Sequence, residues 1–275
     1  MTIDSTRSPR HDGKIMRERL EALYARYNHR RYVHPDPLEF LYDYPDPPDR
    51  EIAGLIASSL AYGRVAQILK SVSIILERMH HSPRLFLMET SQKKLQTAFS
   101  GFRHRFTTGE EVSALLLKTR EQIEQHGSLY RSFLTCLSRD DDTVIPALSI
   151  FVKRFNGDKD DSKSSLMPAP DKGSACKRLN LFLRWMVRKD DVDPGGWDGI
   201  PASKLVIPLD THMYRICSGL DMTCRKQADM QTAIEITEYF RDISPEDPVR
   251  YDFAITRLGI RKDADPRPLF TGIVS

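Results

Sequence analysis

The sequence is short of cysteine. Its four cysteines, at positions 136, 176, 217 and 224, include no C-x-x-C pair, which is the spacing typical of zinc sites and iron–sulfur clusters. Four cysteines in 275 residues also argue against the disulfide framework of a small secreted domain. We therefore expect no disulfide scaffold, no metal bound by cysteine and no cofactor.

Long hydrophobic runs are missing as well. No apolar segment approaches the roughly 18 residues that are needed to cross a bilayer. The N-terminal stretch MTIDSTRSPRHDGK lacks the apolar core of a signal peptide. These absences predict a cytoplasmic protein that does not bind membranes, and we expect it to be a monomer.

Charge of one sign is in only slight excess. The net charge is +3 and the isoelectric point is about 8.6, which suits a polyanionic partner without requiring one. Hydrophobic residues make up 40% of the chain, enough to bury a substantial core. The distribution of charge along the chain must therefore decide between classes of partner.

Alternating apolar and polar residues, which would indicate strands, are also absent over any useful length. Apolar residues instead recur at three- and four-residue steps, for example on both sides of Gly63, which predicts two helices joined there. A capping box from Thr108 to Glu111 and a later Gly127 mark the start and end of another helix. We expect an all-α fold of about ten helices.

The chain is expected to form a single domain. Residues 1–12 are polar and without pattern, as in a disordered tail, and residues 157–173 have the composition of a linker. The prolines of residues 30–50 predict an extended connection. The domain at 13–275 should have two lobes, one from about 50–156 and the other from about 13–49 and 174–275.

The segment KGSACKRLNLFLRWMVRK, residues 172–189, carries six basic side chains and no acidic one. Its apolar residues follow a helical stripe, so it predicts an amphipathic helix. At 100° per residue, Arg184 and Arg188 project within about 20° of Lys177. This shared edge is either a solvated basic face or a surface that follows phosphates or lines an active site.

Asp210 lies in KLVIPLDTHMYRIC, residues 204–217, between a Pro-containing apolar run and a helical pattern. It occupies the position of a helix N-cap, and a cap is a useful place for a catalytic carboxylate because the helix N-terminus stabilises its charge and fixes its direction. His212 could join Asp210 as a metal ligand, although residues two apart on a helix point to different faces.

Together these segments resemble the helix-hairpin-helix DNA glycosylase superfamily. A lysine near the start of a basic helix, followed by an aspartate in an I-P-x-D context, is similar to the pattern of the archaeal 8-oxoguanine DNA glycosylase family, and the 33 positions from Lys177 to Asp210 are similar to its spacing. The segments DREIAGLIASSLAYGRV, GSACKRLNLFLRWMVR and YDFAITRLGI also resemble an uncharacterised bacterial family related to that superfamily, over most of residues 14–260. The hairpin that is typical of that superfamily is reduced here to PDKGSACK, which contains a single glycine, Gly173.

The resemblance implies a fold, a substrate and a reaction. The fold would be the two-lobed helical one of these glycosylases, with a cleft between the lobes. Lys177 would attack the sugar of a nucleotide flipped from damaged duplex DNA, and Asp210 would support the excision of an oxidised purine such as 8-oxoguanine. The resulting Schiff base would allow strand cleavage, so the protein would be a glycosylase with lyase activity acting in DNA repair.

The resemblance and the basic helix also give candidates for contact with DNA. Tyr62 would be a wedge or stacking residue, or else a buried tyrosine at a helix break. Trp185 is the first choice for stacking on the extruded base, ahead of Trp197 and Phe182. The full set of DNA- or base-binding candidates is Tyr62, Arg64, Lys172, Ser174, Arg178, Arg184, Trp185, Arg188 and His212.

Two other classes of protein remain open. One is a non-catalytic helix-hairpin-helix protein that binds nucleic acid. The other is a metal-dependent phosphohydrolase that would use Asp210 and His212 with His29, His34, His80 or His81. The segment GFRHRF, residues 101–106, either docks its aromatic side chains on the core or touches nucleic acid.

Overall fold

The fold is taken from a computed structural model, which describes residues 11–157, 166–261 and 269. The tail expected at 1–12 falls almost entirely outside the described residues, and so does the part of the expected linker at 158–165. The rest of that linker is described: Leu166 and Met167 are buried, and Pro170–Lys172 form a 3-10 helix. Within the described residues the chain is helical apart from one short hairpin, so the prediction of an all-α fold is confirmed.

The elements follow one another as short and medium helices. The α-helices are α1 (His11–Tyr27), α2 (Pro47–Ser59), α3 (Val65–Arg78), α4 (Pro83–Glu89), α5 (Gln92–Phe99), α6 (Gly109–His126), α7 (Leu129–Leu134), α8 (Ile145–Asn156), α9 (Lys177–Val187), α10 (Thr211–Gly219), α11 (Met230–Ile243) and α12 (Asp252–Ile260). The 3-10 helices are η1 (Arg30–Tyr32), η2 (Pro37–Asp43), η3 (Pro170–Lys172) and η4 (Ala202–Lys204), and the hairpin pairs β1 (Arg103–His104) with β2 (Thr107–Thr108).

Local capping signals account for several helix ends. Thr108 and Glu111 form the predicted reciprocal capping box at the start of α6, and Gly127 ends that helix at a φ of 90°. The break near Gly63 separates α2 from α3 as predicted. Sequence patterns that satisfy backbone groups at helix ends are therefore reliable guides to this fold.

The proline-rich stretch after α1 is not the extended connection that its composition suggested. It folds into η1 and η2, and the Asp36 side chain caps η2 by accepting a hydrogen bond from the Leu38 amide at 3.0 Å. Pro37 and Pro47 stand in the first turns of η2 and α2, where a fixed φ suits the helix and a missing amide proton costs nothing.

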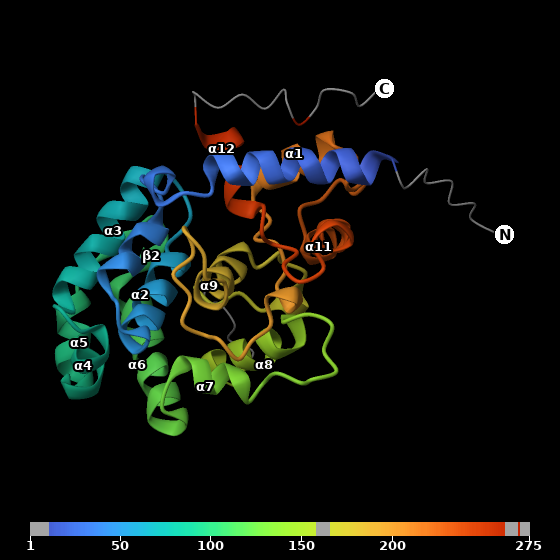
Figure 1. Ribbon diagram of the computed structural model, residues 1–275. Coiled ribbons are helices and arrows are strands. Elements are labelled where there is room, and N and C mark those ends of the chain that lie inside the picture. Colours follow the sequence, from blue (N-terminus) through green and yellow to red (C-terminus); the bar gives the residue numbers. More distant parts are fainter. Residues whose placement is uncertain (1–10, 158–165, 262–268, 270–275) are drawn as a thin grey trace.

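Helix α9 lies at the centre of the molecule, with α2 beside it and α1 and α12 across one end (Figure 1). A Cβ atom added to Gly54 of α2 would lie 3.3 Å from Leu41 and 3.4 Å from Phe182 of α9, so glycine permits this close packing. A single hydrophobic cluster runs through both expected lobes. It includes Trp197, whose ring packs against Tyr130, Phe133 and Phe182.

A buried carboxylate joins α2 to α7. Glu51 is 1% exposed and accepts hydrogen bonds from the amides of Leu129 and Tyr130 and from the indole of Trp197, at 2.8, 3.0 and 3.1 Å. Burial raises the pKa of Glu51 to about 7. Its bonds satisfy the amides at the start of α7, where no helix carbonyl is available.

Among the described residues, no helix combines the length and the apolar composition that a membrane span requires.

Candidate functional site: a lysine and an aspartate at one cavity

Lys177 is the first residue of α9. The residue before it, Cys176, has a φ of 45°, in the left-handed region, and Gly173 has a φ of 80°. These two positions turn the chain sharply into the helix. The Lys177 side chain is left 32% exposed, with its amine at the edge of a cavity.

Asp210 is the N-cap of α10, as the sequence predicted. Its Oδ1 accepts a hydrogen bond from the amide of Met213 at 2.8 Å. Because Oδ1 is held by the helix, Oδ2 has a fixed direction. Oδ2 lies 3.7 Å from the Nζ atom of Lys177. Lys177 and Asp210, to which the resemblance assigns the reaction, therefore lie close together.

The pair opens on a cavity of about 650 Å³. Its walls come from the turn between α2 and α3, from α9, α10 and α12, and from the segment before η2. Its polar lining includes the side chains of Asp36, Tyr62, Lys177, Asp210, Asp252 and Arg257. A volume of this order is typical of small-molecule sites.

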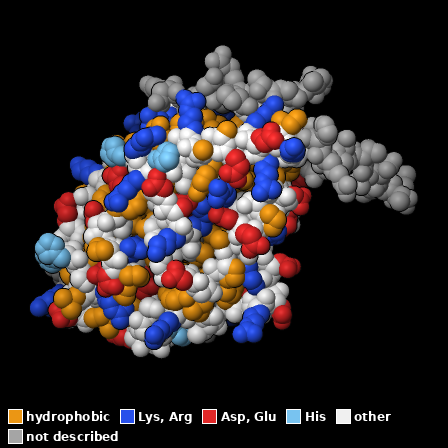
Figure 2. Space-filling view, viewed as in Figure 1, with side chains coloured by type: hydrophobic (Ala, Val, Ile, Leu, Met, Phe, Trp, Pro, Cys, Tyr) orange, Lys and Arg blue, Asp and Glu red, His pale blue; other side chains and the backbone are white. Residues whose placement is uncertain are grey.

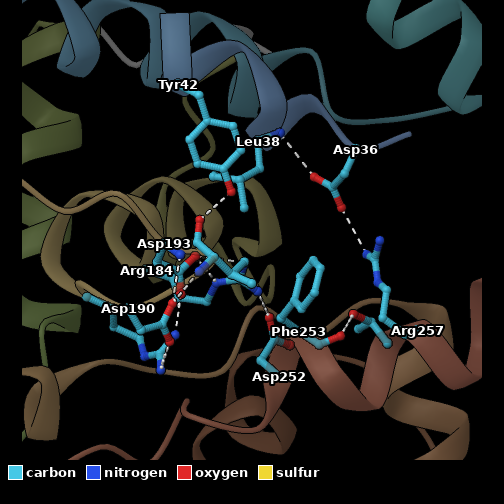
Figure 3. A network of polar contacts seen from close by, with 12 residues as sticks. Asp36, Leu38, Tyr42, Arg184, Asp190, Asp193, Asp252, Phe253 and Arg257 are labelled. Atoms are coloured by element: carbon cyan, nitrogen blue, oxygen red, sulfur yellow. Dashed lines mark hydrogen bonds and ion pairs between the residues drawn. The ribbon is translucent and has the colours of Figure 1, made fainter. Parts of the chain in front are cut away.

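Arg184 and Arg188 do not form the exposed basic edge that was expected. They are 3% and 4% exposed. Arg184 pairs with Asp193 at 3.0 Å and with Asp252, while Arg188 pairs with Asp190 at 2.8 Å, with Asp247 at 2.9 Å and with Asp193. Figure 3 shows part of this network.

The prediction failed because α9 is enclosed. The segment 172–189 has no acidic residue of its own, but the loop that follows it and the start of α12 supply carboxylates to its inner face. Buried charges need such partners, since burial without them is very costly. Arg184 lines the cavity, but its guanidinium is already paired with Asp193 and Asp252.

Asp252 is the most unusual carboxylate in this part of the molecule. It is 1% exposed, one of its oxygens is bonded to Arg184, and Oδ1 has no hydrogen-bond partner among the described residues. Burial raises the pKa of Asp252 to about 6, and the charge of Asp210 contributes in the same direction. This places a second carboxyl group at the cavity that binds a proton more readily than usual.

Further along α12, the helix that begins at Asp252, Arg257 donates to Asp36 at 2.9 Å and lies over the Phe253 ring at 4.3 Å (Figure 3). Asp36, Asp252 and Arg257 were all missed as site residues. Asp252 and Arg257 could have been found from the sequence, because they are the charged residues that interrupt the apolar segment YDFAITRLGI, residues 251–260. Such residues are rarely buried without a partner.

Tyr62 lines the cavity but is firmly held. Its hydroxyl donates to the His104 carbonyl at 2.9 Å and shares a hydrogen bond of 2.7 Å with the Thr107 hydroxyl. The Arg178 guanidinium lies 5.1 Å from the Tyr62 ring centre and donates to the Ser59 carbonyl at 2.7 Å. Tyr62 and Arg178 therefore act as one packed unit rather than as an inserting wedge.

The remaining candidates separate into three groups. Trp185 is 1% exposed and packed in the core, as is Trp197, so neither is placed to stack on a base. Phe182 is also a core residue, as its position on the apolar stripe of the helix predicts. His212 lines the main cavity, and Ser174 lines a smaller neighbouring cavity of about 290 Å³ with Lys177 and Arg178. Arg64 and Lys172 are exposed.

The histidines do not assemble a metal site in the described part of the chain. His29 bonds to Asp191 and His34 to Glu39, each at 2.8 Å, and His80 lines a different cavity. No group of three or more histidine, cysteine, aspartate or glutamate side chains is arranged there to hold a metal ion. The phosphohydrolase hypothesis gains no ligand set from these residues.

The fold and the site thus define a helical protein with a lysine–aspartate pair at a cavity. The family model described as "Protein of unknown function (DUF2400)" matches residues 36–261, which is most of the chain, and the protein belongs to this family. No curated protein and no solved structure matches the chain.

Proposed function

We propose that the protein is a DNA glycosylase with lyase activity that removes an oxidised purine, such as 8-oxoguanine, from duplex DNA. The supporting observation is the 3.7 Å separation of Lys177 Nζ and Asp210 Oδ2 at the mouth of one cavity. A nucleophile and a charged group that act on the same carbon atom must lie this close together.

Lys177 would be the nucleophile. A neutral amine attacks the sugar C1′ atom, a bond forms between Nζ and C1′, and the electron pair of the glycosidic bond leaves with the base, which then takes up a proton. The substituted amine loses a proton, the sugar ring opens, and a Schiff base results. Loss of a C2′ proton then expels the 3′ phosphate and cleaves the strand.

Asp210 would serve this reaction through Oδ2. Since Oδ1 is bonded to the Met213 amide, the carboxylate cannot turn away from the sugar without giving up the helix cap. Oδ2 can accept the proton that the lysine sheds, or it can stabilise the positive charge that develops on the sugar. Either role needs the ionised form, which a helix N-terminus favours.

The cavity supports the same proposal in its size and chemistry. About 650 Å³ is sufficient for a base and its sugar. Its walls present carboxylates from Asp36 and Asp252 and a guanidinium from Arg257, and such groups can hydrogen-bond the edge of an extruded base. The DNA would be the partner, and no metal takes part in the reaction.

The test is borohydride trapping on oligonucleotides that carry an abasic site or 8-oxoguanine. Lys177→Gln should give no trapped adduct because no primary amine remains at the sugar. Asp210→Asn should retain the cap yet lower base excision on the order of a hundredfold or more. Lys189→Gln, which changes an exposed lysine just beyond α9, is the matched control and should trap like the wild type.

Two outcomes would reject the proposal. The first is normal trapping by Lys177→Gln, and the second is excision by Asp210→Asn at the wild-type rate with equal folded fractions. Binding of the oligonucleotides without any adduct in the wild type would instead favour the non-catalytic nucleic-acid-binding protein.

A further inference from the structure

A phenylalanine projects from the hairpin beside the cavity. Phe106 is 77% exposed, more than any other large hydrophobic side chain among the described residues. It follows β1, between Arg105 and Thr107, and Arg103 and Arg105 are exposed as well. Of the two interpretations of GFRHRF, docking of the aromatic side chains on the core holds for Phe102, at 6% exposure, but not for Phe106.

The hairpin that carries Phe106 is rigidly anchored. His104 is fully buried, with Nδ1 bonded to the Ser71 hydroxyl at 2.9 Å and Nε2 bonded to the Tyr62 carbonyl at 3.1 Å. Burial lowers the pKa of His104, so the imidazole stays neutral and can accept one bond while donating the other. The Tyr62 hydroxyl holds the hairpin from the other side through His104 and Thr107.

Arg105 fixes the tip of the hairpin against the cavity rim. Its φ of 53° lies in the left-handed region, which costs energy for a residue with a Cβ atom and needs support from its surroundings. Its guanidinium lies 5.7 Å from the Phe106 ring centre and 5.9 Å from that of Tyr62.

Gly63 makes room for the Arg105 side chain. A Cβ atom at Gly63 would lie 2.8 Å from Cδ and Nη1 of Arg105. Gly63 and Tyr62 both line the cavity that holds Lys177 and Asp210. The hairpin that carries the exposed phenyl ring therefore packs, through Arg105, against two residues of the cavity wall.

We propose that Phe106 inserts into the base stack of duplex DNA at the gap left by a nucleotide that enters the cavity. This inference rests on the proposed function and identifies the part of the protein that opens its substrate. Extruding a nucleotide costs a few kcal/mol of stacking and pairing, and an apolar side chain placed in the gap offsets part of that cost.

The neighbouring charges suit duplex DNA as the occupant. Arg103 and Arg105 flank the ring along the hairpin, so the phosphates beside the gap would meet two cations while the bases meet the phenyl ring. Tyr62, which the sequence put forward as the wedge, has its hydroxyl bonded twice and its ring packed against His104 at 4.7 Å. It supports the hairpin, and Phe106 makes the insertion.

The experiment compares Phe106→Ala with Phe106→Trp and with Leu85→Ala as a matched control. Leu85 is another exposed apolar residue, at 55%, on α4, and truncation of either exposed side chain should change the folded fraction little. One readout is single-turnover excision of 8-oxoguanine from a duplex. Another is borohydride trapping on an abasic site in a single strand, where no stacked base must be displaced.

Phe106→Ala should slow duplex excision by roughly tenfold or more and leave single-strand trapping unchanged, because only the stack-opening step depends on the ring. Phe106→Trp and Leu85→Ala should behave like the wild type. Wild-type duplex excision by Phe106→Ala would overturn the inference while leaving the glycosylase proposal intact.

A third readout works even without catalysis. In a duplex with 2-aminopurine beside a tetrahydrofuran abasic analogue, binding of the wild type or of Phe106→Trp should change the fluorescence, and binding of Phe106→Ala should not. The absence of trapped adducts together with this difference would reject the glycosylase and keep the insertion. Equal signals from the wild type and Phe106→Ala, or no binding of the duplex, would overturn the insertion.

Discussion

Asp210 combines two tasks in one carboxylate. Oδ1 caps α10 by accepting from the Met213 amide, and Oδ2 faces Lys177. The sequence indicated both the cap and the spacing to the lysine, because each depends on residues near one another in the chain or on a motif. The sequence did not predict that Asp252 would lie close enough to Asp210 for the charge of Asp210 to raise the pKa of Asp252, because the two residues belong to separate helices.

Variants of Asp210 should separate the cap from the charge. Asparagine caps a helix about as well as aspartate, whereas alanine forfeits about 1 kcal/mol. The Lys177–Asp210 ion pair is partly exposed, so removing it should lower the free energy of unfolding only slightly. Urea unfolding should therefore give Asp210→Asn nearly the wild-type free energy of unfolding and Asp210→Ala a value lower by about 1 kcal/mol. Equal losses in both variants would show that the charge, not the cap, stabilises the fold.

At the scale of the elements, the helix ends were predictable and the burial of whole faces was not. The capping box of α6 and the break at Gly63 follow from local backbone chemistry. The basic face of α9 looked like a surface because its carboxylate partners come from outside the helix. Only the three-dimensional packing of α9 at the centre brings those charges together.

Glu51 offers a test of how α2 and α7 are joined. Burial raises the pKa of Glu51 from 4.5 to about 7. Between these two pH values, the Glu51 carboxyl group therefore keeps its proton in the folded chain and loses it in the unfolded chain. The stability from that proton is full below pH 4.5 and is lost as the pH rises through 7. Between these limits, the free energy of unfolding of the wild type should fall by about 2 to 3 kcal/mol relative to Glu51→Gln.

Urea titrations at several pH values would measure this difference. The control is Glu246→Gln, which removes an exposed carboxyl group and should run parallel to the wild type. A wild-type curve that stays parallel to Glu51→Gln across the range would mean that Glu51 does not hold a proton in the folded state.

At the scale of the whole molecule, the face drawn in Figure 2 carries charges of both signs. On the face in Figure 2, basic and acidic side chains lie side by side, with no continuous stripe of one sign. Arg184 of α9 and Arg188, which follows that helix, are engaged in internal ion pairs. The proposal that DNA is the substrate therefore rests on the lysine–aspartate pair at the cavity and on the resemblance of the sequence. The net charge of +3 suits a DNA partner without requiring one.

The most direct measurement is to locate the covalent bond itself. The wild-type protein would be incubated with an oligonucleotide that carries an abasic site, and the Schiff base would be reduced with borohydride. The adduct would then be digested, and the modified residue would be located by mass spectrometry. We predict a single modified peptide whose sugar remnant is attached to the Nζ atom of Lys177. Attachment to another lysine or to the N-terminal amine, or no attachment under conditions in which the DNA is bound, would contradict the central claim.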